Sequence, residues 1–242
     1  MIDVTAVLNV HDEAILTGPS VLNFEATIGR ARDAGLAVES LVVLDKPTPE
    51  TVLQFEHAQA RGHRIVMSDA GNLALARNVA VEHASGRFVG FLDADDLWSE
   101  NWLAEAFAFC RSQKAVAAHS EFNLFFGKSP GTIVAHADSK DAAFDPDVLR
   151  VANYWDSLVF TSRETLQKHP YAPIDFVEGY GYEDWHWNCL TFAAGIHHRP
   201  VPGTVHFKRR RERSLTTESI DSDLLPRRTT LSAYSWAKRA PA

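Results

Sequence analysis

Three carboxylates end an apolar run in the middle of the chain, Phe88-Val-Gly-Phe-Leu-Asp-Ala-Asp-Asp96. At an effective dielectric constant of ~20, two carboxylates about 5 Å apart repel each other by roughly 3 kcal/mol. Such a group favours a divalent cation, and oxygen ligands with no Cys or His close in sequence favour magnesium or manganese. The pattern predicts a metal site at the tip of a β-strand, with Asp93 and Asp95 as candidate ligands.

Three known acidic motifs compete for these residues. An EF-hand loop beginning at Asp93 would place Trp98 where glycine is needed and Ala104 where glutamate is needed, which excludes it. The aspartyl nucleophile of phosphatases resembles a motif that ends a first strand, whereas this one lies near residue 93 and precedes Leu97. The DxD motif of nucleotide-sugar transferases expects a strand, an acidic tip and a helix, which residues 97–111 supply. The remaining alternative is an Asp-rich turn that only caps this helix.

Length and composition fit a single compact enzyme. The chain has 242 residues, of which 45% are hydrophobic, and a formal charge of -7, which disfavours a nucleic-acid partner. No apolar stretch reaches 18 residues, and no basic segment precedes an apolar one at the start, so we expect neither a transmembrane helix nor a signal peptide. Cys110 and Cys189 lack CxxC spacing, and we interpret them as free buried thiols. Free thiols favour a protein of the reducing cytoplasm.

The first half alternates short apolar runs with helical patterns, which predicts an α/β fold with a mostly parallel sheet flanked by helices. The expected strands are residues 4–9, 40–44, 64–67, 88–92 and 115–119. The expected helices are residues 20–34, 51–61, 73–84 and 100–111. Ligands of such open sheets gather at the carboxyl ends of the strands. Polar residues at three of these ends, 9–13, 45 and 93–96, therefore predict one shared pocket.

After about residue 122 the pattern becomes irregular, and we interpret it as the second half of the same domain. It contains a strand at 158–160, a helix at 163–168, and a Gly179-Tyr-Gly-Tyr182 loop that leads into Glu183-Asp184 and a helix through residue 194. We expect a single domain over 1–219, with a nucleotide-binding half at 1–121 and an acceptor half at 122–219. Residues 220–242 would be a tail or the start of a linker.

Four segments, in this order and spacing, resemble the family 2 glycosyltransferases, which are inverting enzymes of the GT-A fold. They are Gly71-Asn-Leu-Ala-Leu-Ala-Arg-Asn78, Ala84-Ser-Gly-Arg-Phe88, Phe91-Leu-Asp-Ala-Asp-Asp96 and Gly181-Tyr-Glu-Asp-Trp185. They are similar to the family's glycine-x4-Ala-Arg-Asn segment, its Ala-x-Gly turn, its DxD strand and its Glu-Asp motif. The resemblance spans roughly residues 3–215.

The resemblance implies roles on the donor side. Asp95 would ligate the metal, Asp93 would contact the ribose or the metal's waters, and Ala94 would lie beside the donor. Arg77 would lie near the diphosphate, where cationic groups absorb the charge of the departing nucleotide; the alternative is a surface arginine. The ends of the first strands would add a last group of donor-binding residues, Asn9, His11, Glu13 and Asp45.

Base recognition departs from the family pattern. His11 stands where the family usually has an aromatic residue that stacks on the base. Leu44-Asp-Lys-Pro47 replaces the usual Asp-Asp-Gly-Ser, although Asp45 keeps one carboxylate able to accept a pyrimidine N–H. Uridine is the favoured base by resemblance, with thymidine and guanosine left open.

An inverting transfer needs one base to take the proton of the acceptor hydroxyl. Asp184 is the candidate, at the expected N-terminus of a helix, with Trp185 and Trp187 available to exclude water and raise its pKa. Glu183 would orient the acceptor or its neighbour. The alternative is that both carboxylates only complement the helix dipole.

The cationic run Lys208-Arg-Arg-Arg-Glu-Arg213 suggests a diphosphate clamp, because family members carry a His- or Arg-containing loop ending in Ser near this point. Arg210 and Arg211 are the candidates. His206 is a third candidate metal ligand, and the alternative is a structural histidine. The alternative is a nucleic-acid or targeting patch. Basic and apolar residues in 224–228 and 234–239 suit an anionic membrane surface, a partner or a following domain, or else an ordinary terminal helix.

Together these features predict a metal-dependent inverting glycosyltransferase that uses manganese or magnesium. Its donor would be a nucleotide-sugar, with a UDP-sugar favoured, and its acceptor a glycan or a lipid-linked glycan in bacterial-type surface polysaccharide synthesis. It would be cytoplasmic, or at the cytoplasmic face of the membrane. The alternatives are a non-catalytic binding module of the same fold and a nucleotidyltransferase, although 9–13 lacks the Gly-rich basic loop of the latter.

Overall fold

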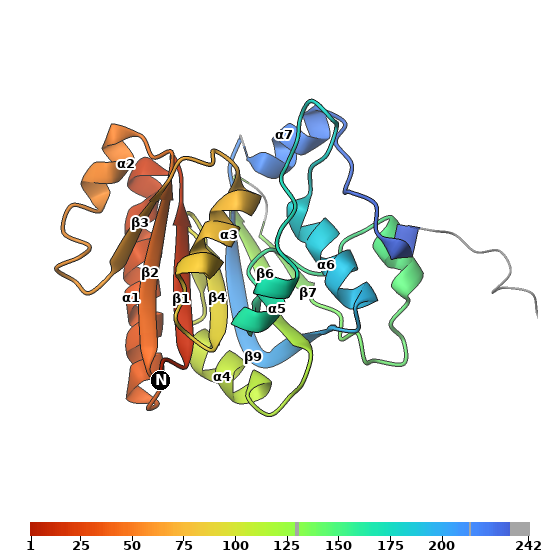
Figure 1. The fold of residues 1–242 in the computed structure, drawn as a ribbon, viewed down its shortest axis with the longest axis horizontal. Helices are drawn as coiled ribbons and strands as arrows, with labels where there is room; N and C mark the ends of the chain where they lie inside the picture. The colour runs from red at the N-terminus through yellow and green to blue at the C-terminus, as the bar shows by residue number, and fades with distance from the viewer. Residues whose placement is uncertain (129–130, 213, 233–242) are drawn as a thin grey trace, which may run out of the picture.

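A computed structural model describes residues 1–128, 131–212 and 214–232. In that part of the chain one mixed sheet runs through the molecule in the order β3-β2-β1-β4-β8-β6-β9-β5, and β7 pairs with β6 outside this path (Figure 1). The first four strands of this path are parallel to one another, as the alternating sequence pattern predicts. They are β1 (Val4–Val10), β2 (Val38–Asp45), β3 (Arg64–Ser68) and β4 (Phe88–Asp93).

The second half of the sheet is built around one long parallel pair. Strand β8 is antiparallel to both β4 and β6, and β9 is parallel to β6. The carboxyl end of β9 therefore lies at the same edge of the sheet as the carboxyl ends of β1, β2 and β4. The strands of this half are β5 (Leu97–Trp98), β6 (Val116–Gly127), β7 (Thr132–Ala135), β8 (Phe160–Ser162) and β9 (His197–Arg210).

Helices cover both faces of the sheet and bury its apolar side chains. Helices α1 (Thr17–Asp33) and α4 (Trp102–Cys110) pack on one face, and α1 contributes Val21, Phe24 and Ile28 at helical spacing. The other face carries α3 (Leu73–His83), α5 (Arg163–Lys168) and α6 (Glu183–Ala193). The remaining helices are α2 (Pro49–Gln54), α7 (Leu215–Asp221) and three short 3-10 turns, Ala14–Leu16, Pro146–Arg150 and Thr230–Ser232.

Three expected elements differ from the structure. The helix expected at 51–61 ends at Gln54 and continues as turns. The helix expected from Leu97 begins only at Trp102, because residues 97 and 98 form β5 and pair with β9. The strand expected at 158–160 occupies Phe160–Ser162. Pairing with distant strands decides the last two cases, and local sequence pattern does not encode it.

Gly86, in the turn before β4, is required by a close backbone approach. Its N–H donates to Thr5 Oγ1 at 2.8 Å, and a Cβ at this position would lie 2.3 Å from the backbone nitrogen of Thr5. Real Cβ atoms do not approach that closely, so a side chain here would push β4 away from β1. The Ala-x-Gly motif thus sets how the DxD strand enters the sheet.

We expect Gly86→Ala to lower the free energy of unfolding by about 1–3 kcal/mol, the usual cost of overpacking a tight contact. Gly29→Ala is the matched control, because no atom lies within 4 Å of its Cβ position in the middle of α1. Alanine is favoured over glycine in a helix by ~1 kcal/mol, so the control is expected to be stabilised. Urea denaturation of both variants measures the difference, and equal effects would contradict the assigned role of Gly86.

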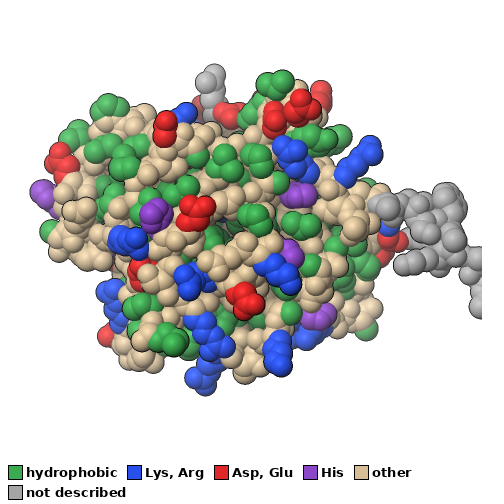
Figure 2. All heavy atoms as spheres, in the orientation of Figure 1, with side chains coloured by type: hydrophobic (Ala, Val, Ile, Leu, Met, Phe, Trp, Pro, Cys, Tyr) green, Lys and Arg blue, Asp and Glu red, His purple; other side chains and the backbone are tan. Residues whose placement is uncertain are grey.

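The packed part of the chain continues beyond the expected boundary at residue 219. Ser219 is 1% exposed within α7, Leu224 is 3% exposed, and Leu225 forms a bridge with Tyr180. Figure 2 shows acidic side chains gathered around α7, and Glu218, Asp221 and Asp223 are exposed there, which disfavours contact with an anionic membrane at this point. The expectation for 234–239 lies outside the described residues. Within the described residues, no helix is both long enough and apolar enough to cross a membrane.

Candidate active site

The tip of β4 forms the centre of the site. Asp93 ends the strand, and the Asp96 N–H donates to the Asp93 carbonyl at 3.0 Å, which closes a turn that carries the largely buried Asp95 and Asp96. Ala94 points its methyl group into the core and donates its N–H to the Asn9 carbonyl at 3.0 Å, which ties the turn to β1. Ala94 therefore positions the turn.

Asn9 pairs with Asp93 across the strands and is 4% exposed. Neither polar atom of its side chain has a hydrogen-bond partner among the described residues. Buried polar groups are costly without a partner, so this amide points to a polar ligand at the carboxyl end of β1. Asn9 stays a predicted donor-binding residue on this ground.

Arg77 is completely buried and joins the two motifs of the site. Its guanidinium donates to Glu183 at 2.6 Å and to both oxygens of Asp93 at 3.2 and 3.3 Å. Burial alone would lower the pKa of Arg77, but the carboxylates of Asp93 and Glu183 outweigh it and raise this pKa above its ordinary value. The structure corrects the prediction of a diphosphate contact, because Arg77 is inaccessible to a ligand and instead links β4 to α6.

We expect Arg77→Leu to lower the free energy of unfolding by about 3–5 kcal/mol, the typical loss when one partner of a buried ion pair is removed. The cost arises because Glu183 and Asp93 would remain buried without their cation. Arg87→Leu, at a residue exposed before β4, is the control and is expected to change stability by less than about 1 kcal/mol. Thermal or urea unfolding measures both, and equal losses would contradict this role of Arg77.

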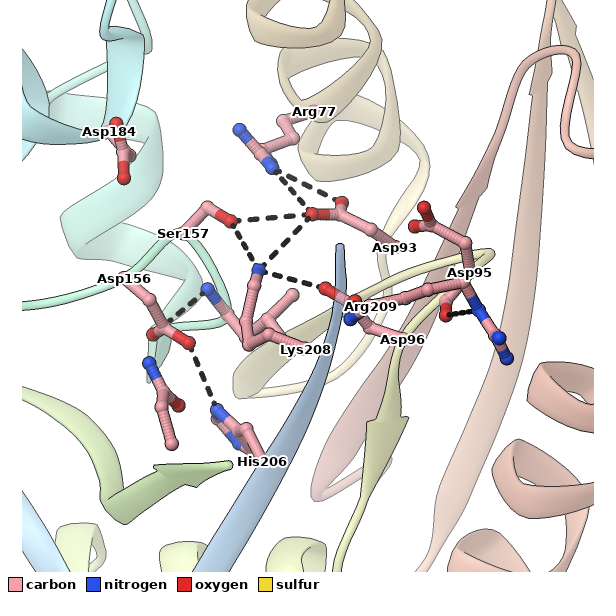
Figure 3. Close-up of polar contacts among 12 residues, drawn as sticks. Arg77, Asp93, Asp95, Asp96, Asp156, Ser157, Asp184, His206, Lys208 and Arg209 are labelled. Carbon is pink, nitrogen blue, oxygen red and sulfur yellow. Dashed lines mark hydrogen bonds and ion pairs between the residues drawn. The ribbon is translucent and has the colours of Figure 1, made fainter. Parts of the chain in front are cut away.

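Lys208, near the end of β9, supplies the second cation of the cluster. Its ammonium lies 2.8 Å from Asp96 Oδ2, 4.0 Å from Asp93 Oδ2 and 3.5 Å from Ser157 Oγ (Figure 3). Burial alone would lower the pKa of Lys208, but the neighbouring carboxylates outweigh it and raise this pKa. Ser157 in turn donates to Asp93 at 3.3 Å. Two of the three strand-tip carboxylates are thus neutralised by the protein itself.

Asp95 is the carboxylate with the weakest compensation. Arg211 Nε lies 2.8 Å from Asp95 Oδ2 but is not aligned for a hydrogen bond, and an Arg211 terminal nitrogen lies 4.0 Å from Glu13. Burial, and then the negative charge of Asp96, raise the pKa of Asp95 to about 7. Burial also raises the pKa of Glu13. The predicted donor residues Glu13, Asp95 and Arg211 therefore form one group, in which a single arginine faces two carboxylates.

Two other candidate residues, Arg210 and His206, contact aromatic rings. Arg210 stacks its guanidinium 4.2 Å from the ring centroid of Phe125. His206 is fully buried, with Nδ1 3.3 Å from an Asp156 oxygen and its ring edge-on to Trp102. Nε2 of His206 has no hydrogen-bond partner among the described residues, so its role as a metal ligand stays a prediction. Lys208, two residues further along the strand, faces the carboxylates.

The carboxylates at the tip of β4 differ in how well each could bind a metal. Within the described residues, no group of three His, Cys, Asp or Glu side chains is arranged to hold a metal ion alone. Asp93 and Asp96 have cationic partners, although burial raises the pKa of Asp96 as it does that of Asp95. The cation beside Asp95, Arg211, is poorly aligned. Magnesium is usually bound by one or two carboxylates together with substrate phosphates. Asp95 fits this pattern as a single protein ligand whose shell the donor would complete.

The Glu-Asp motif opens α6, as the sequence predicts. Tyr182 precedes it with φ of 53°, a left-handed conformation that non-glycine residues rarely adopt and that often marks functional sites. Glu183 accepts a hydrogen bond from Arg77. This contact corrects the expectation that Glu183 orients the acceptor. Asp184 is held by the Trp185 N–H at 2.8 Å and by Asn153 at 3.3 Å.

Burial, and then the charge of Glu183, raise the pKa of Asp184 to about 7. The direction agrees with the expectation, and shielding by the two tryptophans stays a prediction. Trp187 packs into the core against Tyr171, and Trp185 donates its ring N–H to the Leu149 carbonyl. In Figure 3, Asp184 and Asp95 lie on opposite sides of the group formed by Asp93, Ser157 and Lys208. This arrangement offers a base on one side and a charged binding group on the other.

The predicted base-recognition residues meet at the ends of β1 and β2. His11 is exposed, and its Nδ1 lies 2.5 Å from the Asp45 carbonyl oxygen, so its ring is fixed beside this strand end. The Asp45 carboxylate accepts from Ser68 Oγ and from the N–H groups of Gly71 and Asn72. It therefore holds the loop before α3, a role that the sequence reading missed.

Sequence reasoning also missed three residues of the charged centre: Asp96, Ser157 and Lys208. Lys208 belongs to the cationic run, and counting alternate residues back along β9 from its end would have placed it on the same face as His206. Nothing in the local sequence marks Ser157, which reaches Asp93 only through the fold.

Comparison with known proteins places this arrangement in a family. The family model for "Glycosyl transferase family 2" matches residues 22–158, which is more than half of the chain and includes the whole strand tip. The chain belongs to glycosyl transferase family 2. Its mixed sheet flanked by helices is the GT-A fold.

Two curated bacterial proteins are similar in sequence to part of this family 2 chain. TuaG of Bacillus subtilis strain 168, named as a putative teichuronic acid biosynthesis glycosyltransferase, is 32% identical over 89 residues, 36% of this chain and 35% of TuaG. WfgD of Escherichia coli, a UDP-Glc:α-D-GlcNAc-diphosphoundecaprenol β-1,3-glucosyltransferase, is 39% identical over 66 residues, 27% of this chain and 26% of WfgD. The matches thus span about a third or less of the relatives.

Solved structures share the fold at low sequence identity. S. aureus TarS 1–349 in complex with UDP-GlcNAc superposes with a TM-score of 0.61 at 15% identity, covering 89% of this chain and 61% of TarS. The mannosyltransferase PcManGT from Pyrobaculum calidifontis, in complex with GDP-Man and Mn²⁺, gives 0.60 at 21% identity, covering 89% of this chain and 59% of PcManGT. At such low sequence identity, these similarities show a shared fold and nothing more.

Proposed function

We propose that this family 2 glycosyltransferase moves a sugar, with inversion and with the help of a divalent metal, from a nucleotide-sugar to a glycan or lipid-linked acceptor. The observation that carries the proposal is the pairing of two partly buried carboxylates, Asp184 and Asp95, across one charged centre. Each has its pKa raised to about 7 by burial and like charges. One is suited to accept a proton near neutral pH, and the other is suited to receive a metal.

Asp184 is the proposed base. The acceptor hydroxyl oxygen attacks the anomeric carbon as Asp184 takes its proton, the new carbon–oxygen bond forms, and the bond to the phosphate oxygen breaks. The electron pair of the broken bond leaves with the nucleoside diphosphate. Because attack comes from the side opposite the leaving group, the anomeric configuration inverts. Asn153 and the Trp185 N–H hold the carboxylate in place through the contacts described above.

The leaving diphosphate needs positive charge, and the proposed source on the chain is Arg211. Its guanidinium is 30% exposed and is poorly aligned on Asp95, so it is able to turn toward a ligand. A divalent metal bound through Asp95 and the diphosphate would stabilise the charge that develops on the leaving group. Asn9, Glu13 and His11 line the same edge of the sheet, and we assign them to the ribose and base.

A UDP-sugar and a polyprenyl-diphosphate-linked acceptor are the favoured substrates. The WfgD name gives both for that relative, and TarS was solved with UDP-GlcNAc. A lipid-linked acceptor would place the reaction at the cytoplasmic face of a membrane.

A calorimetric screen of UDP-, dTDP- and GDP-sugars with Mn²⁺ tests the proposal. We expect one nucleotide to bind at least about tenfold more tightly than the others, because an unmatched buried polar group in the base site is costly. Slow donor hydrolysis, followed by transfer to a lipid-linked acceptor, would identify the enzyme. Binding without hydrolysis or transfer would instead favour a binding module, and absence of binding would overturn the assignment.

A further inference from the structure

Lys208 holds a position that the acidic motif alone would assign to a metal. Three carboxylates at a strand tip call for a cation, and the sequence favours a divalent ion. In the structure an ammonium group lies 2.8 Å from Asp96 and 4.0 Å from Asp93, with Ser157 Oγ at 3.5 Å. The Lys208 side chain is 16% exposed, and Asp96 is 4% exposed at its side chain, so water screens this pair little.

The position of Lys208 is fixed by the strand that carries it. His206 and Lys208 point to the same face of β9, and His206 is fully buried against Asp156. Arg209, the residue after Lys208, donates its backbone N–H to Asp96 at 2.7 Å and its side chain to the Asp95 carbonyl at 3.0 Å. These contacts hold β9 against the turn 93–96, which leaves the ammonium little freedom to move away.

The cationic side chains around the strand tip are shared unequally among its three carboxylates. Asp93 faces Arg77 and Lys208, and Asp96 faces Lys208. Among the described residues, Asp95 has one cationic partner, Arg211, which lies 2.8 Å away but is not aligned for a hydrogen bond. A divalent ion approaching Asp93 or Asp96 would meet the ammonium at contact distance, and cation–cation repulsion at such a distance strongly disfavours binding.

We propose that Lys208 is a built-in cation that excludes a divalent metal from Asp93 and Asp96, so that the strand tip offers a metal only Asp95. The inference rests on the proposed function, since it concerns the metal that accompanies the donor. A single carboxylate holds Mg²⁺ or Mn²⁺ weakly, because the metal needs further oxygen ligands. Metal therefore binds together with the nucleotide diphosphate and leaves with it, and the free enzyme stays metal-free.

The test is a titration of the protein with Mn²⁺ in which free Mn²⁺ is followed by electron paramagnetic resonance. Lys208→Gln removes the charge, Lys208→Arg retains it, and Lys128→Gln removes an exposed lysine paired with Glu212. Without nucleotide, we expect Lys208→Gln to bind Mn²⁺ at least about tenfold more tightly than the wild type, because Asp96 loses its cation and Asp93 loses one of its two. Lys208→Arg and Lys128→Gln are expected to behave as the wild type.

Thermal unfolding gives a second readout that does not depend on turnover. We expect Mn²⁺ to raise the melting temperature of Lys208→Gln and to have no such effect on the double variant Lys208→Gln/Asp96→Asn. If Lys208→Gln folds only with Mn²⁺ present, the inference is supported as well. If it fails to fold even with Mn²⁺ while the double variant folds, or if it binds Mn²⁺ no better than the wild type, the inference is overturned.

The proposed function fails differently. If the wild type binds no nucleotide with or without Mn²⁺, the donor assignment is wrong, whatever Lys208 does. If the wild type binds UDP with Mn²⁺ and Lys208→Gln gains no nucleotide-free Mn²⁺ binding, only the role of Lys208 is wrong.

Discussion

Replacing Asp184 by Asn is expected to lower turnover by ~10²–10⁴, the usual contribution of general-base catalysis. Asparagine keeps the size and hydrogen bonding of the side chain but cannot accept the acceptor's proton. Donor affinity is expected to change little, because the proposed metal and diphosphate contacts involve Asp95 and Arg211. Single-turnover transfer from radiolabelled donor measures the rate, and calorimetry measures donor affinity. Asp33→Asn, at the exposed end of α1, is the matched control.

The rate of the parent enzyme is expected to depend on pH in a defined direction. Asp184 acts as a base only when ionised, and burial raises its pKa to about 7, so kcat/KM rises as pH rises through about 7. The pKa of Asp95 is raised to about 7 as well, so UDP affinity with Mn²⁺ must be measured at each pH to separate metal binding from the base.

If the Asp184→Asn variant transfers sugar as fast as the parent, the base lies elsewhere. Glu183 is then the next candidate, although one of its carboxylate oxygens already accepts a hydrogen bond from Arg77 at 2.6 Å. Loss of all activity in Glu183→Gln, together with a large loss of stability, would indicate the structural role that the contact predicts.

Asp95→Ala is expected to abolish the part of UDP affinity that depends on Mn²⁺. Asp95 is the one strand-tip carboxylate without a well-aligned cation among the described residues, so its removal deletes the proposed protein ligand of the metal. Stability is expected to change little, because a partly buried carboxylate surrounded by Asp96, Asp93 and Glu13 is itself unfavourably placed. Calorimetry of UDP with and without Mn²⁺ measures the effect.

Asp33→Ala serves as the control for this variant, since it removes an exposed carboxylate at the far end of α1. An unchanged UDP affinity of Asp95→Ala in Mn²⁺ would refute the assignment of Asp95. Loss of UDP binding with Mn²⁺ absent as well would mean that Asp95 contacts the nucleotide directly.

The nucleotide-binding half is predictable from the sequence because its signals are local. Each of its strands is a short apolar run, and each following helix repeats apolar residues at a helical period. The carboxyl ends of parallel strands must then meet, which correctly brought Asn9, Glu13 and Asp93 to one edge. Helix α5 has the bounds predicted for it, and in the structure the Ser162 side chain caps its first turn.

The charged centre was less predictable because its contacts join distant segments. Arg77 and Glu183 are 106 residues apart, and Lys208 and Ser157 are 51 apart. Motifs reveal which residue types are present, but they do not reveal which carboxylate a given cation will neutralise. For this reason the sequence assigned Arg77 to the diphosphate and His206 to the metal, whereas the structure pairs Arg77 with two carboxylates and His206 with Asp156.

The Arg77 contact also limits how this enzyme can be re-engineered by exchange of segments. A chimera that joins residues 1–121 to the second half of another protein would keep Arg77 and Asp93 but lose Glu183. The transplanted half would have to bring its own carboxylate to the first turn of the helix that replaces α6. Without it, the guanidinium would be enclosed opposite a single acid, and the hybrid would fail at folding before its acceptor preference could be assayed.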